Sequence, residues 1–121
     1  MKTYMSITSV PASGVLTIKE GNLTRVFFDI EPLPATEEND NENQYSCENV
    51  DIVDSDYSKA VAAIVTSRYD INNQYAILAN YDESKDPNSD LTDAKRAEYL
   101  QEYADFQLWR KKAKEVALLI D

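Results

Sequence analysis

The chain has 121 residues, the length of one ordinary domain, and its 43% hydrophobic and 28% charged residues are normal globular values. This composition argues against wholesale disorder, and no apolar run approaches the ~18 residues of a membrane span. The first residues also lack the apolar core of a secretory signal, so we expect a protein that is used inside a cell or carried in a particle.

The net charge of −10 belongs almost wholly to the middle of the chain. Residues 1–34 and 57–121 are close to balance, whereas residues 35–56 hold eight acids and no base. The eight are Glu37, Glu38, Asp40, Glu42, Glu48, Asp51, Asp54 and Asp56. A surface this acidic repels a phosphate backbone, so we expect no direct contact with nucleic acid, and the missing apolar span predicts no membrane partner.

The first third of the chain predicts an antiparallel sheet. Residues 4–10 are rich in β-formers, residues 15–19 form a short strand, and Gly21 permits a hairpin turn into residues 23–30. In this last strand apolar residues alternate with others until two prolines, which cannot donate to a ladder, end it. The chain is expected to re-enter the sheet over residues 45–53.

Residues 35–44 contain almost nothing that a core would bury, which predicts a solvated, mobile loop. A calcium site is the alternative, because the segment is rich in oxygen ligands, but the glycine and glutamate spacing of an EF-hand is missing. Cys47 is the one cysteine and there is no histidine, which excludes an internal disulfide and a Cys–His zinc site. We expect Cys47 to be an inert, partly buried thiol, since its neighbours are acidic.

From residue 54 onward the apolar period changes from 2 to about 3.6, which predicts three helices. Asp54 or Ser55 is expected to cap the first helix, and Asp70 or Asn72 the second. One face of the second helix carries Ile71, Tyr75, Leu78 and Tyr81.

The third helix is the longest, because no Gly or Pro interrupts it from its expected cap, Thr92, to about Leu119. Its main apolar stripe consists of Tyr99, Tyr103, Phe106, Trp109, Ala113, Val116 and Ile120. One interpretation is that this stripe packs in the core. The other is that part of it contacts a partner, since Leu100 and Leu108 belong to a second apolar row and Trp and Arg are frequent hot-spot residues. The candidate partner-binding residues are Leu100, Tyr103, Phe106, Leu108, Trp109 and Arg110.

The sequence therefore predicts an α+β fold in a single domain, residues 1–121. An N-terminal antiparallel sheet of three or four strands is expected over residues 1–53. A three-helix region that ends in a long amphipathic helix is expected over residues 54–121.

The residue types carry no trace of known catalytic machinery. Without histidine there is no Ser–His–Asp or Cys–His pair, and two glycines are too few for a phosphate loop. We therefore predict that the chain is not an enzyme and takes no cofactor or metal. An enzyme of unfamiliar type, the alternative, requires a pocket with convergent carboxylates.

Three segments resemble small accessory proteins encoded by tailed phages and prophages of gut bacteria. They are residues 60–70 (Ala-Val-Ala-Ala-Ile-Val-Thr-Ser-Arg-Tyr-Asp), 74–81 (Gln-Tyr-Ala-Ile-Leu-Ala-Asn-Tyr) and 102–114 (Glu-Tyr-Ala-Asp-Phe-Gln-Leu-Trp-Arg-Lys-Lys-Ala-Lys). In that family an Ala-Ile-Ile-x-x-x-Tyr-Ser helix precedes a helix that ends in Ala-Ile-x-x-Asn, and a helix of the form Glu-Tyr-x-x-Phe-x-x-Trp/Tyr-Arg-x-x-Ala-Lys follows. The aromatic-Arg end is also similar to the C-terminal helix of phage tail-fibre assembly chaperones.

This resemblance spans about residues 55–117, with Asp70 where the family has serine and a different linker after Tyr81. It implies a non-catalytic, virion-associated or tail-assembly protein in the virion or the host cytoplasm. Its partners are then other phage structural proteins or a second copy, and no catalytic residue comes with it. The alternative is an acidic anti-defence inhibitor of a nucleic-acid-binding host protein, which the eight acids of residues 35–56 suggest.

Overall fold

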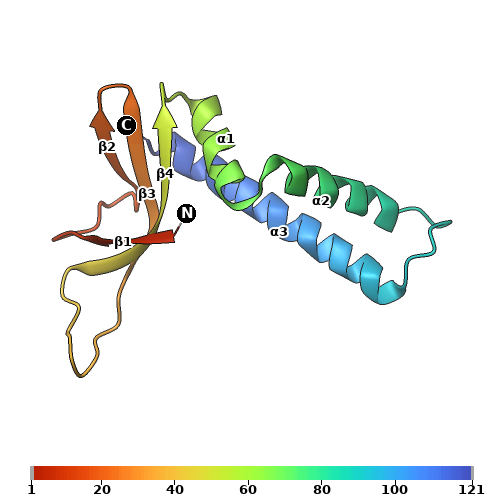
Figure 1. Cartoon of the computed structure of the whole chain (residues 1–121), viewed down its shortest axis with the longest axis horizontal. Helices are drawn as coiled ribbons and strands as arrows, with labels where there is room; N and C mark the ends of the chain where they lie inside the picture. Colours follow the sequence, from red (N-terminus) through yellow and green to blue (C-terminus); the bar gives the residue numbers. More distant parts are fainter. Residues whose placement is uncertain (1, 121) are drawn as a thin grey trace.

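A computed structural model describes residues 2–120 of the chain (Figure 1). Four strands come first: β1 (Lys2–Ser6), β2 (Leu16–Glu20), β3 (Leu23–Pro32) and β4 (Gln44–Val53). Three helices follow: α1 (Tyr57–Arg68), α2 (Ile71–Ser84) and α3 (Asp93–Leu118). The predicted α+β class is confirmed, with an N-terminal antiparallel sheet and a long last helix.

The sheet has the strand order β1-β4-β3-β2, and every neighbouring pair is antiparallel. Gly21 takes a φ of 60° in the β2–β3 turn, a conformation that costs glycine little. The predicted alternation in β3 is confirmed, because Val26 and Phe28 are buried whereas Arg25 is exposed. Val26 lies opposite Val50 of β4, so the two central strands supply the same face of the core.

A β-bulge in β3 was not predicted from the sequence. Phe28 pairs with Glu48, but the next pair is Glu31 with Ser46, so β3 holds one extra residue there. Asp29 adopts a φ of 50° at this point, in the left-handed region that Asp tolerates better than most residues. Bulges bend a strand and increase its twist, and Figure 1 shows β4 curving strongly beside this region.

One face of the sheet is covered by α1 and by the C-terminal half of α3 (Figure 1). The buried apolar residues of the sheet and the helices form one cluster, in which Val26, Ile64 and Ala113 are almost completely enclosed. The other buried members are Val15, Phe28, Val50, Ile52, Ala60, Val65, Ile77, Phe106, Trp109, Val116 and Ala117. This shared core fixes the C-terminal half of α3 against the sheet.

Two boundaries near the sheet differ from the prediction. The first strand ends at Ser6 rather than at residue 10, although the Ile7 N–H still donates to the Asn43 carbonyl at 3.0 Å. The α1 helix is capped by Asp56, whose carboxylate accepts the Lys59 N–H at 2.8 Å. The expectation that Asp54 or Ser55 caps this helix was therefore wrong.

The other two helix starts agree with the prediction. Asp70 caps α2 by accepting the Asn73 N–H at 2.7 Å, which selects Asp70 over Asn72. Thr92 caps α3 by accepting the Lys95 N–H at 3.1 Å. None of the helices in residues 2–120 combines the length and apolar character needed to cross a membrane.

The α2 helix and residues 93–108 of α3 form an antiparallel hairpin, the arm, that projects from the sheet (Figure 1). The Tyr81 and Tyr103 rings stack across it, with centroids 3.6 Å apart and an angle of 10° between their planes. At its outer end the Arg96 guanidinium donates to the carbonyls of Ser84, Asp86 and Ser89 at 2.7, 3.1 and 3.0 Å. One arginine thus fixes the connection between the two helices.

Candidate protein-binding surface

Trp109, one of the six predicted partner-binding residues, is a core residue. It is 5% exposed, and its indole N–H donates to the Ile64 carbonyl at 2.9 Å. The Arg68 guanidinium lies 3.6 Å from the indole centroid and forms an ion pair with Glu48 at 3.3 Å. Trp109 therefore joins α3 to α1 and the sheet, as the core-packing interpretation expects.

Phe106 is also in the core. It is 3% exposed, and the ring of Tyr69 meets it edge-on with centroids 5.0 Å apart. Arg110 is half-buried beside it, and its guanidinium donates to the side-chain oxygen of Gln107 at 2.8 Å. Of the predicted contact residues, Phe106 and Trp109 thus have almost no surface to offer a partner.

The remaining candidates lie on the arm surface. Leu100 is 46% exposed and Leu108 is 66% exposed, whereas Tyr103 is half-buried by its stack on Tyr81. Leu108 borders a hollow of about 490 Å³ together with Arg68 and Trp109, beside the sheet. The structure therefore divides the six predicted residues among the core and different sides of α3.

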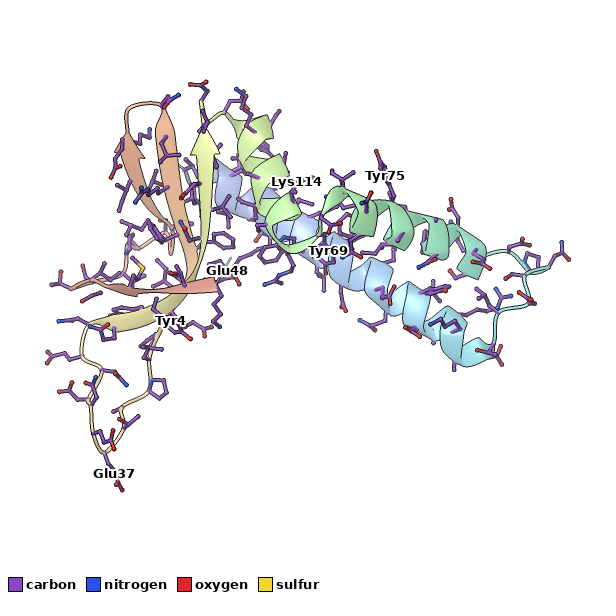
Figure 2. All side chains as sticks on the ribbon, in the orientation of Figure 1. Tyr4, Glu37, Glu48, Tyr69, Tyr75 and Lys114 are labelled. Atoms are coloured by element: carbon purple, nitrogen blue, oxygen red, sulfur yellow. The ribbon has the colours of Figure 1, made fainter. Side chains whose placement is uncertain are left out.

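The row on α2 was not predicted as a binding surface. Ile71, Tyr75 and Leu78 are 52%, 68% and 43% exposed, and Figure 2 shows Tyr75 pointing away from α3. Ile77 is the apolar α2 side chain that is buried. The spacing of the row is visible in the sequence, but the sequence does not reveal which side of α2 packs on α3.

We infer from helical periodicity that the exposed rows of α2 and α3 lie on the same side of the arm. At about 100° per residue, Ile71, Tyr75 and Leu78 fall within an arc of about 60°. In an antiparallel helix pair, this arc of α2 lies on one side of the contact between the two helices. The arc of α3 that holds Leu100 and Tyr103 lies on the same side of that contact. We call these five residues the neutral face.

The opposite side of the arm is acidic. A hollow of about 270 Å³ there is lined by Asn73 and Ile77 of α2 and by Glu102 and Asp105 of α3. Glu98 precedes Glu102 by one helical turn and falls on the same side. The neutral face differs, because residues 71–81 carry no charged side chain. An uncharged, aromatic and aliphatic helix surface is typical of the centre of a protein interface.

Carboxylates do converge near the β3 bulge, as the enzyme alternative requires. Asp29, Glu31 and Glu48 line a hollow of about 350 Å³ together with Lys2 and Arg68. Two of them form ion pairs with helix residues, Asp29 with Lys112 at 2.5 Å and Glu48 with Arg68 at 3.3 Å. These pairs link the sheet to α3 and α1, which gives Asp29 and Glu48 a structural role.

A second pair of carboxylates lies at the other end of the sheet. Asp54 and Asp56 border a hollow of about 520 Å³ with Tyr57, Leu118 and Ile120. Asp56 is the N-cap of α1, so its carboxylate already accepts a backbone N–H. Asp54 takes a φ of 49° in the turn that follows β4. Within residues 2–120 no three His, Cys, Asp or Glu side chains are grouped so that they could hold a metal ion.

Cys47 and the acidic loop are the two other features that the sequence singled out. Cys47 is buried, and this burial, followed by the negative charge of Glu48, raises the pKa of its thiol above the ordinary value of 9.0.

Residues 35–43 form an exposed loop between β3 and β4, with Glu37 near its tip (Figure 2). The Asn41 amide donates to the Pro34 carbonyl and closes the loop.

No protein-family model, curated protein or solved structure matches this chain. The candidate surface therefore depends on the residues and geometry of the chain itself.

Proposed function

We propose that the chain is a non-catalytic protein-binding protein, and that it serves a phage as a virion-associated or tail-assembly accessory protein. The observation that supports binding is the neutral face, where Tyr75 leaves 68% of its surface exposed beside Ile71 and Leu78. Exposing three large apolar side chains in one row costs solvation free energy unless a partner covers them.

The phage context of the proposal depends on the resemblance of residues 60–70, 74–81 and 102–114. The first segment runs from α1 to the N-cap of α2, and the other two lie in α2 and α3, so the three belong to the arm and its attachment to the sheet. The proposed location is accordingly the virion or the host cytoplasm, and the proposed partners are phage structural proteins or a second copy of the chain.

Affinity purification of the tagged chain from phage-producing cells, followed by mass spectrometry, tests this function. We expect tail, baseplate or fibre proteins to be recovered with the wild-type chain. Recovery should fall at least about tenfold with Tyr75→Glu, because burying an unpaired carboxylate in an apolar contact costs more than about 1.4 kcal/mol. Leu108→Glu is the matched control, since Leu108 is 66% exposed and, at about 100° per residue, lies about 80° around α3 from Leu100. Equal recovery of phage proteins by Tyr75→Glu and wild type would reject the neutral face as the site where those proteins bind.

The acidic loop favours a second candidate function, inhibition of a nucleic-acid-binding host protein. Its acids Glu37, Glu38, Asp40 and Glu42 are all exposed, and none forms an ion pair with a lysine or arginine within residues 2–120. This function predicts recovery of a host nuclease or defence complex, lost when the four acids are changed to amides and weakened steeply by salt. Binding that salt does not change would exclude it.

A further inference from the structure

We propose that the partner on the neutral face is a second copy of this chain, and that two arms pair into a four-helix bundle. The inference rests on the proposed function only in taking the neutral face to be a protein-binding surface. Three observations point to a second copy as the occupant: the charge distribution of the chain, the spacing of the row on α2, and the exposed side-chain area of the neutral face.

The charge distribution favours contact between two copies through the neutral face. Two copies that each carry −10 repel each other wherever their acidic surfaces approach. Residues 71–81 are the part of α2 without any charged side chain, and the acids Glu102 and Asp105 lie on the opposite side of the arm. The acidic loop is remote from the arm, at the other end of the molecule in Figure 1. Contact through the neutral face therefore brings two acidic chains together where the least charge is buried.

The row on α2 is also suited to pair with itself. Ile71, Tyr75 and Leu78 follow the i, i+4, i+7 spacing, and Tyr75 lies next to the midpoint of the row. In an antiparallel helix pair with two-fold symmetry, Ile71 faces Leu78 of the second copy and the two Tyr75 side chains meet near the axis. An isologous interface requires this kind of self-complementary patch.

The area is less than that of a standard interface and allows only a weak, reversible dimer. The exposed fractions of Ile71, Tyr75, Leu78 and Leu100 are 52%, 68%, 43% and 46%, which together expose roughly 350 Å² of side-chain surface. The small or uncharged residues between them extend a face about 20 Å long, and a standard interface buries about 800 Å² per partner. The contact is therefore at the small end of dimer sizes, and we expect a Kd of about 1–100 µM.

Pairing of two helical hairpins is a common way to form a four-helix bundle. Each arm already buries one side of α2 against α3, through Ile77 and the Tyr81–Tyr103 stack. The second copy covers the side that remains apolar, and Asp82 then lies at the rim. The two sheets, with their acidic loops, project from opposite ends of the bundle and stay available for other partners.

Sedimentation equilibrium of the purified full-length chain, from about 1 to 500 µM, tests the proposal. We expect a concentration-dependent monomer–dimer equilibrium that Tyr75→Glu and, independently, Leu78→Glu weaken at least about tenfold. Leu108→Glu adds the same charge at a site of matched exposure on another side of the arm and should leave the Kd within about twofold. Far-UV circular dichroism confirms that each variant keeps its helices.

Salt supplies a second, independent readout. Because the copies repel each other, dimerisation should tighten when NaCl is raised from about 0.02 to 0.5 M. A monomer at every concentration would overturn the proposal, as would a dimer that Tyr75→Glu leaves intact or that salt dissociates. These outcomes are separate from failure of the proposed function: a strict monomer that still loses phage partners with Tyr75→Glu rejects only the second copy as occupant.

Discussion

Trp109 connects the two parts of this protein through a single side chain. Its N–H donates to the Ile64 carbonyl at 2.9 Å, and its ring supports the guanidinium of Arg68. Trp109→Phe removes the donor but keeps most of the apolar volume, so we expect the free energy of unfolding to fall by about 1–2 kcal/mol. Trp109→Ala also leaves a cavity and should cost about 3–5 kcal/mol. Urea denaturation measures both, and Leu108→Ala, on the surface, should change stability by less than about 0.5 kcal/mol.

If Trp109→Ala and Leu108→Ala cost the same, the indole is not the connection that the structure indicates. The comparison also separates stability from binding. A change at Trp109 reaches partners only through the fold, whereas a change at Tyr75 acts on the surface itself.

Cys47 gives a residue-scale prediction about pH. Burial raises the pKa of its thiol above the ordinary value of 9.0, so the folded chain keeps the proton where the unfolded chain loses it. The stability linked to this thiol is therefore fully present below about pH 9 and is lost as pH rises through the folded-state pKa. Between about pH 8 and pH 10, unfolding free energies from urea denaturation should fall more steeply for the wild type than for Cys47→Ala.

Parallel pH dependences in the two proteins would show that Cys47 ionises as readily in the fold as outside it. The same burial predicts slow labelling by a thiol reagent at about pH 8 in the native state and rapid labelling in urea.

At the scale of elements, the start of α1 provides a test of local structure. Asp56 accepts the Lys59 N–H at 2.8 Å, so Asp56→Ala should destabilise the chain by about 1 kcal/mol. Ser55→Ala is the adjacent control and should be nearly neutral, because Ser55 does not cap the helix. Thermal melting of the two variants decides between them, and a larger loss for Ser55→Ala would contradict the cap geometry.

The element boundaries show what a sequence determines locally and what it does not. The alternation of Val26 and Phe28, the turn at Gly21 and the cap at Thr92 were predicted because each depends on a few neighbouring residues. The cap of α1 was misplaced because residues 54–56, two acids and a serine, all suit an N-cap by type. Tertiary geometry selects Asp56, since the Asp54 N–H donates to the Asn22 carbonyl in the turn from β4.

The candidate surface was harder to predict than the fold for a related reason. Periodicity identified the apolar rows of the last two helices, but a row has the same pattern whether it packs in a core or faces solvent. The stripe that contains Phe106 and Trp109 is buried by the sheet and α1, and the row that contains Tyr75 is not. Only the long-range placement of α3 against the sheet decides which row remains exposed.

At the scale of the whole molecule, stability is distributed unevenly between the sheet and the arm. Among residues 2–120, the buried core draws its apolar side chains from the strands, Val15 just before β2, α1 and the C-terminal half of α3, whereas α2 contributes Ile77 alone. Regions with few buried apolar contacts open at lower free energy than the global unfolding transition. The arm should therefore be the first part of the fold to open.

Native-state hydrogen exchange measures this difference and links it to the neutral face. At about 1 µM, at or below the expected Kd, amides of α2 should exchange at least about tenfold faster than amides of β3 and β4. At about 500 µM the second copy covers Tyr75 and stabilises the arm by mass action, so protection in α2 should rise while protection in the sheet stays constant. In Tyr75→Glu this rise should disappear. A rise of equal size in α2 and in the sheet would instead show that the copies meet elsewhere on the molecule.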